Sequence, residues 1–146
     1  RTIKAPAPEA YVFATSFHCV GMGMAAAIGA GVATPDPVLL VTGDGGFMMG
    51  GVTELYAAVR EGLDLVVAIC NDGGYGAEYV QLANRDMDPG LSLIEWPDLA
   101  EVEAAMGCAS MTVRSEADLA QACKLIAERD RPVVLDLRLD PAAVTM

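Results

Sequence analysis

The sequence has little positive charge. Its 146 residues contain 9 Lys and Arg against 20 Asp and Glu, so the net charge at pH 7 is −11. Such an acidic chain is not expected to bind nucleic acids or anionic membrane surfaces, because like charges repel. A phosphate-bearing ligand would need a metal ion or backbone N–H groups to hold it.

The sequence also lacks the residue patterns of a zinc site. His18 is the single histidine, and the cysteines include no Cys-x-x-Cys pair. The four cysteines are Cys19, Cys70, Cys108 and Cys123. They lie in apolar or helical surroundings, which is typical of free thiols in a reducing compartment, and we expect a cytoplasmic protein.

Long apolar runs are missing too. The chain is 53% hydrophobic, which suffices for a core, but Gly, Pro or Asp interrupts its apolar runs. We therefore expect no membrane-spanning segment, and the first residues show no secretory signal pattern. The length suits a single domain over residues 1–146. Residues 1–10 read as a linker, and because residue 1 is Arg we expect a processed chain or the end of a longer one.

Short apolar strands alternate with helical segments along the sequence. Strands are predicted at residues 11–15, 38–42, 65–70, 109–113 and 132–139. Helices are predicted at residues 21–33, 52–62, 97–107 and 116–130, with a short helix after residue 76. The continuous apolar run at 38–42 predicts a strand buried on both faces. The alternation predicts an α/β fold with a mostly parallel central sheet.

Two glycine-rich loops follow neighbouring strands. Asp44 lies in VTGDGGFMMGG (41–51), and Asn71 and Asp72 begin NDGGYG (71–76). The helix between the loops would run about 21 Å, and the next strand would return about 20 Å. Both loops should therefore meet at the carboxyl edge of the sheet, where doubly wound folds bind ligands.

The residues of these loops suit a metal-bridged phosphate. Mg²⁺ prefers one or two carboxylates, together with carbonyl, water and phosphate oxygens. Asp44 and Asp72 would supply carboxylates, a glycine of the second loop a carbonyl, and Gly45 and Gly46 backbone N–H groups for the phosphate. Either loop alone would suit a plain strand-to-helix turn with an Asp cap, but the pair favours a site.

The pattern GDGGFMM…TEL…A…L…VV…NDGGYG resembles the diphosphate-binding motif of thiamine diphosphate enzymes. Together with GMGMAAAIGAGVATPDPVLLVTGDGGF upstream, it is similar to the acetolactate synthase, pyruvate oxidase and benzoylformate decarboxylase group. The resemblance covers residues 16–82 in detail. It implies a three-layer α/β/α thiamine diphosphate-binding fold, and a chain that forms the C-terminal diphosphate-binding domain of a longer enzyme.

The resemblance also implies roles for the residues of the first loop and for one glycine of the second. Asp44 would ligate Mg²⁺, and Gly45 and Gly46 would hold the diphosphate. When the second loop is aligned on its Tyr-Gly pair, the second metal ligand falls on Asp72, where the family usually has Asn. The carbonyl ligand then falls on Gly74.

Further cofactor contacts are implied around this core. If the family's usual spacing governs instead, the second ligand is Asn71. Tyr75 would lie against the cofactor loop. Val20 stands where the family places a bulky apolar side chain under the bent cofactor, usually Leu, Ile or Met. The carbonyl of His18, two residues earlier, would receive the aminopyrimidine nitrogen.

The resemblance places the catalytic Glu on a separate pyrimidine-binding domain, so no catalytic residue is expected in this chain. A pyrimidine-binding domain or subunit would complete the enzyme, as a homodimer or homotetramer. The complete enzyme would be a lyase or transferase that uses the cofactor as nucleophile and electron sink on a small 2-keto acid. The choice among decarboxylase, carboligase and oxidase stays open.

Two other functions fit parts of the sequence. GMGMAA (21–26) after the strand at 11–15, with Asp44 ending the next strand, resembles the fingerprint of a Rossmann-like NAD- or FAD-binding domain, but it leaves NDGGYG unexplained. A non-catalytic thiamine diphosphate-binding module is the third hypothesis. Trp96, which precedes a proline, is expected to serve only as surface or core packing.

Overall fold

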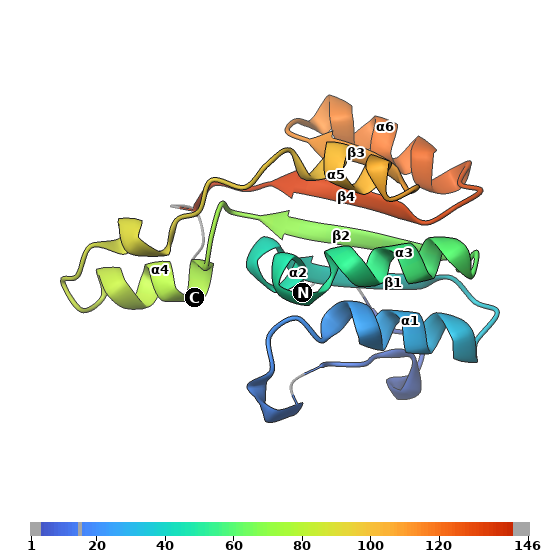
Figure 1. Ribbon diagram of the computed structural model, residues 1–146, viewed down its shortest axis with the longest axis horizontal. Helices are drawn as coiled ribbons and strands as arrows, with labels where there is room; N and C mark the ends of the chain where they lie inside the picture. Colours follow the sequence, from blue (N-terminus) through green and yellow to red (C-terminus); the bar gives the residue numbers. More distant parts are fainter. Residues whose placement is uncertain (1–3, 15, 142–146) are drawn as a thin grey trace.

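A parallel sheet forms the centre of the molecule. The computed structural model describes residues 4–14 and 16–141. The sheet has four strands in the order β1-β2-β4-β3 (Figure 1). The strands are β1 (Val38–Gly43), β2 (Leu65–Asn71), β3 (Ala109–Val113) and β4 (Val133–Arg138). All three pairings are parallel, so the carboxyl ends of the strands share one edge.

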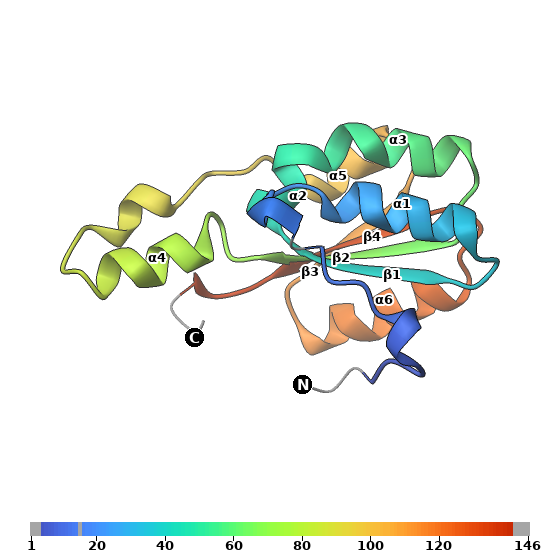
Figure 2. The same cartoon turned by 90° about the horizontal axis from the view of Figure 1, so that it is seen from below.

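Helices cover both faces of the sheet. One face carries α1 (Gly23–Ala33), α2 (Asp44–Gly50), α3 (Val52–Arg60) and α5 (Leu99–Ala105), and the other carries α6 (Glu116–Ala127) (Figure 2). The helix α4 (Gly76–Ala83) extends beyond the carboxyl ends of the strands, together with the 3-10 turn η3 (Pro89–Ser92) (Figure 1). The predicted three-layer α/β/α fold with a parallel sheet is confirmed.

Two apolar clusters hold these layers together. The larger lies between the sheet and the four-helix face and includes Met24, Phe47, Leu55, Val67 and Leu99. A smaller cluster under α6 includes Val113, Ala122, Val133 and Leu135. Burying a side chain of this size contributes about 1.5–3 kcal/mol, so these clusters are the main source of stability.

Side-chain caps set where α5 and α6 begin. The Ser115 hydroxyl accepts a hydrogen bond from the Asp118 N–H, which is the predicted capping pattern. The Asp98 carboxylate accepts from the N–H groups of Ala100 and Glu101, so α5 begins two residues later than the proline that was expected to start it. At the end of α3, Gly62 adopts φ +61°, as a helix-terminating glycine should.

Two predictions about strands were wrong. Residues 11–14 form no strand; Tyr11, Val12 and Phe13 are exposed, and Thr15 lies outside the described residues. An apolar stretch becomes a strand only where a neighbour completes its hydrogen bonds, and this segment is paired with none of the four strands. β1 is not buried on both faces: it is an edge strand with Leu39 51% and Val41 53% exposed.

The N-terminal residues differ from a plain linker. Residues 8–10 of the predicted linker form the 3-10 turn η1 (Pro8–Ala10), and residues 1–3 lie outside the described residues. A second 3-10 turn, η2 (Ser16–His18), precedes α1. Among the described helices, none combines the length and the apolar character needed to cross a membrane.

Candidate functional site

The two glycine-rich loops meet at the carboxyl edge of the sheet. Asp44 is the first residue of α2, directly after β1, and residues 72–75 connect β2 to α4. The Gly74 N–H donates a 2.9 Å hydrogen bond to Asp44 Oδ2. The Gly74 carbonyl oxygen lies 3.3 Å from the position that a Cβ on Gly45 would take. The structure therefore brings Asp44, Gly45 and Gly74 together.

Side chains added at two glycines of these loops would displace their neighbours. A Cβ on Gly45 would lie 2.7 Å from Tyr75 Cδ1, closer than carbon atoms can approach. A Cβ on Gly76 would overlap the Asp72 carboxylate. The Tyr75 ring thus covers the first loop, and the Asp72 carboxylate lies against the start of α4.

The Asp44 carboxylate is buried and held by two donors. Its residue is 1% exposed. Oδ2 accepts the Gly74 N–H and, at 2.6 Å, the Trp96 Nε1–H. Hydrogen bonds to an ionised acceptor are the stronger kind, and two of them on one oxygen restrict how the carboxylate can turn.

The Asp72 carboxyl group lies within the electrostatic influence of Asp44. Burial raises the pKa of Asp72, and the charge of the Asp44 carboxylate raises it further. The pKa of the Cys70 thiol is also raised, first by burial and then by the charges of Asp72 and Asp44. Two carboxylates therefore converge at the end of β2, and a divalent cation is the ligand that relieves such repulsion.

Asn71 is directed toward β4. Its side chain is 1% exposed, and Nδ2 donates a 2.7 Å hydrogen bond to Asp136 Oδ1. Its Oδ1 accepts the Gly73 N–H at 3.1 Å. Asp136 also forms a 2.8 Å ion pair with Arg138. Both ends of the Asn71 amide are thus engaged within the protein.

Residues 92–96, which we call the strap, run alongside the second loop. Gly74 and Leu93 form an antiparallel bridge. The Tyr75 N–H donates to the Ser92 carbonyl at 3.0 Å, and the Ile94 N–H donates to the Gly73 carbonyl at 2.7 Å. The strap ends at Trp96, whose ring also packs against the larger core cluster.

Trp96 is the site residue that the sequence did not reveal. We predicted a packing role only, whereas its indole N–H reaches Asp44 across 52 positions of sequence. Hydrophobic periodicity and turn residues indicate only contacts between residues that are close in sequence. The site predicted from the two glycine-rich loops did not include the strap. The position of Trp96 next to a proline does not indicate a role at the site.

The upstream segment approaches the first loop through Val20. Val20 Cγ1 lies 3.7 Å from the position of a Cβ on Gly46. Gly21 adopts φ +95°, and its carbonyl would meet a Cβ on Gly50 at 2.8 Å, so residues 20–21 pack closely on α2. His18 stands two residues before Val20 in an exposed turn, with φ +50°.

The structure lacks the strand that the Rossmann-like hypothesis requires within the described residues 11–14. That fingerprint needs a strand directly before the first glycine, and residues 11–14 form none. Asp44, expected to bind a ribose, is instead buried under Trp96 and Gly74.

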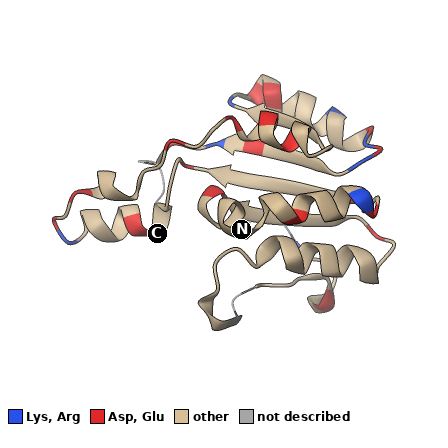
Figure 3. Ribbon diagram, in the orientation of Figure 1, with Lys and Arg blue, Asp and Glu red and all other residues tan. Residues whose placement is uncertain are grey.

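Basic side chains are scarce near the site (Figure 3). Arg138, at the end of β4, is paired with Asp136. Among the described residues, no group of three or more His, Cys, Asp and Glu side chains could hold a metal. A cation bound by Asp44 and Asp72 would therefore need backbone and ligand oxygens to complete its coordination.

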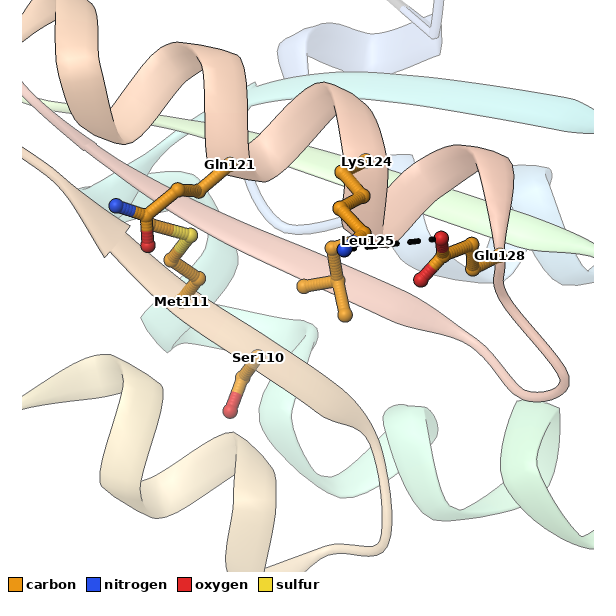
Figure 4. Close-up of a pocket in the computed structure, with 6 residues that line it drawn as sticks. All are labelled: Ser110, Met111, Gln121, Lys124, Leu125 and Glu128. Carbon is orange, nitrogen blue, oxygen red and sulfur yellow. Dashed lines mark ion pairs between the residues drawn. The ribbon is translucent and has the colours of Figure 1, made fainter.

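An open surface pocket lies away from this site. It has a volume of about 510 Å³ and lies between α6 and the amino end of β3 (Figure 4). Its lining residues are Ser110, Met111, Gln121, Lys124, Leu125 and Glu128. Lys124 and Glu128 form a weak 4.0 Å ion pair across an open surface, and the glycine loops lie at the opposite edge of the sheet.

Comparisons with known proteins agree with this architecture. A family model described as "Thiamine pyrophosphate enzyme, C-terminal TPP binding domain" matches residues 1–137. A putative acetolactate synthase large subunit of Mycobacterium tuberculosis is 33% identical over 143 residues, which cover 97% of this chain and 26% of that protein. A probable 2-ketoarginine decarboxylase of Pseudomonas aeruginosa is 34% identical over 116 residues, covering 77% of this chain and 20% of that protein.

A solved structure shares the fold. The thiamine diphosphate-dependent 4-hydroxybenzoylformate decarboxylase of Rhodococcus jostii superposes with a TM-score of 0.72 at 30% identity. The match covers 83% of this chain and 23% of that one. The chain thus spans about a quarter of the length of the curated relatives it matches.

Proposed function

We propose that this chain binds thiamine diphosphate through Mg²⁺. The proposal starts from the family: the chain belongs to the thiamine pyrophosphate enzymes, as a C-terminal cofactor-binding domain. We further propose that it is part of an acetolactate synthase-like 2-keto acid decarboxylase or carboligase. The convergence of Asp44, Asp72 and the Gly74 carbonyl at one edge of the sheet carries the proposal.

The donor set fits Mg²⁺. Two carboxylates and a backbone carbonyl are hard oxygen ligands, and they leave positions open for diphosphate oxygens and water. Asp72 suits the second ligand position better than Asn71, because Asp136 and Gly73 already engage both ends of the Asn71 amide. The charge of Asp44 that raises the pKa of Asp72 is the charge that a cation would offset.

The remaining site residues would position the cofactor. The N–H groups of Gly45 and Gly46 would hold the diphosphate, and the Tyr75 ring would shield it from water. Val20, next to Gly46, would support the cofactor from below, and the His18 carbonyl would orient the aminopyrimidine. When bound, thiamine diphosphate supplies a nucleophilic carbon and an electron sink.

The chain alone is proposed to be catalytically incomplete. The matched relatives extend well beyond the region that this chain covers. We propose that a second, pyrimidine-binding domain or subunit supplies the catalytic Glu, in a homodimer or homotetramer. A small 2-keto acid is the proposed substrate. The described cysteines are free thiols, which supports a cytoplasmic location. Turnover of 2-keto acids by the isolated chain would contradict this part of the proposal.

Calorimetric titration of thiamine diphosphate with and without Mg²⁺ tests the binding function. We expect the wild-type chain to bind only with Mg²⁺, and Asp44→Ala to abolish binding, because it removes a ligand that the remaining oxygens cannot replace. The matched control is Asp130→Asn, which changes an exposed carboxylate that is paired with the neighbouring Arg131. This variant should bind like the wild type. Binding that is independent of Mg²⁺ or unaffected by Asp44→Ala would refute the proposed site.

A further inference from the structure

We propose that Trp96 is a positioning residue for the cation site: its indole N–H fixes the Asp44 carboxylate so that Oδ1, rather than Oδ2, faces the metal ion. The inference rests on the proposed function, because it assigns a role toward the same cation. It concerns a residue that lies outside both glycine loops and that contacts the carboxylate directly.

The contact is built to hold a buried charge. Asp44 is 1% exposed, so its carboxylate has lost most of its hydration. The Trp96 Nε1–H and the Gly74 N–H replace part of it, at 2.6 Å and 2.9 Å, and both bind Oδ2. An ionised oxygen out of water needs such donors, since leaving it unpaired is costly.

The backbone on both sides of Trp96 is anchored. The Trp96 backbone N–H donates to the Ile94 carbonyl at 3.1 Å, within the strap that pairs with Gly73 and Gly74. Two residues after Trp96, Asp98 caps α5, and Leu99 is fully buried. The backbone that carries the ring is therefore anchored between the loop and a buried helix, and the ring packs against the larger core cluster.

This arrangement selects one oxygen of Asp44. With both donors on Oδ2, Oδ1 is the oxygen that neither of them uses. Mg²⁺ demands near-octahedral geometry and therefore gains from carboxylates that are already oriented. Hydrogen-bond partners behind metal ligands commonly change metal affinity by about 10- to 100-fold when they are removed.

The structure offers a direct probe of this contact. Trp96 is the only tryptophan, so its indole N–H gives a single resonance in a ¹H–¹⁵N spectrum. In the proposed arrangement Asp44→Asn shifts that resonance, because the acceptor loses its charge. The addition of Mg²⁺ and thiamine diphosphate to the wild-type chain shifts it as well.

The binding experiment uses Trp96→Phe, which keeps an aromatic ring but removes the donor. We expect Mg²⁺-dependent binding of thiamine diphosphate to weaken about 10- to 100-fold. Tyr56→Phe also removes one donor from an aromatic ring, on the exposed side of α3, and should bind within about twofold of the wild type. Far-UV circular dichroism and the melting temperature establish that Trp96→Phe is folded.

The outcomes separate this inference from the proposed function. Trp96→Phe that is folded and binds like the wild type overturns the inference and leaves the proposed function intact. A wild-type chain that never binds thiamine diphosphate counts against the proposed function instead. In that case the indole resonance still tests the hydrogen bond from Trp96 to Asp44. A shift in Asp44→Asn supports this bond, and an unchanged resonance overturns the inference.

Discussion

At the scale of single residues, Glu103 is a buried acid. It lies in α5 with 0% exposure, and within the described part of the chain neither of its carboxylate oxygens accepts a hydrogen bond. Burial raises the pKa of Glu103 to about 8, with further contributions from the charges of Asp136 and Asp98. The side chain is therefore protonated over most of the range below pH 8 in the folded state.

This raised pKa predicts how stability depends on pH. The unfolded chain releases the Glu103 proton near pH 4.5, so the folded state holds more protons between about pH 4.5 and 8. Stability from this group therefore falls as the pH rises through that window, by at most about 1.4 kcal/mol per pH unit. Urea unfolding of wild type and Glu103→Gln across the window measures it.

We expect Glu103→Gln to flatten that pH dependence, because the amide does not titrate. Glu101→Gln, an exposed acid on the same helix, is the control and should keep the wild-type slope. The same slope in wild type and Glu103→Gln would show that Glu103 is not held protonated in the folded chain.

At the scale of elements, the effect of replacing a glycine depends on what surrounds it. Gly45→Ala is expected to displace the Tyr75 ring, because the new Cβ would lie 2.7 Å from it, and so to weaken Mg²⁺-dependent cofactor binding at least about tenfold. Gly29→Ala, in the middle of α1, is the matched control, because nothing lies within 4 Å of its new Cβ.

The control variant Gly29→Ala is expected to change stability in a definite direction. Alanine is the better helix former, so Gly29→Ala should raise the free energy of unfolding by about 0.5–1 kcal/mol and leave binding unchanged. Calorimetry and urea unfolding of both variants measure the two effects. If Gly45→Ala binds like Gly29→Ala, the close packing of the two loops is not needed for the site.

Elements that carry their own local signals could be predicted from the sequence. The apolar runs of β1 and β2 located both strands, and the Ser115 cap located the start of α6. The strand expected at 11–15 was wrong, because a strand depends on a partner that the local sequence does not encode. The exposed face of β1 was missed for the same reason, since burial on that side depends on what the chain packs above it.

Only the part of the candidate site that follows from strand and helix lengths could be predicted from the sequence. Strand and helix lengths place Asp44 and Asp72 at one edge, and the structure brings the two loops into contact. The strap and Trp96 could not be predicted, because their contacts depend on how a later segment packs back onto the loop. The orientation of Asn71 toward Asp136 likewise depends on the position of β4.

At the scale of the whole molecule, apolar side chains are exposed on β1 and in the N-terminal segment. Leu39 and Val41 of the strand are about half exposed, and Phe13 and Val20 of the N-terminal segment are more exposed still. Exposed apolar side chains that share one face of a strand, as Leu39 and Val41 do, are typical of interaction surfaces. This agrees with a domain that spans about a quarter of the length of its relatives.

Anomalous diffraction from Mn²⁺, in crystals grown with thiamine diphosphate, tests the central proposal most directly. Mn²⁺ accepts the same oxygen ligands as Mg²⁺ and can be located without ambiguity. We expect one peak between the diphosphate and the oxygens of Asp44, Asp72 and Gly74, with Asn71 still bonded to Asp136. A metal bound through Asn71, or cofactor bound with no metal at these residues, would contradict the proposed site.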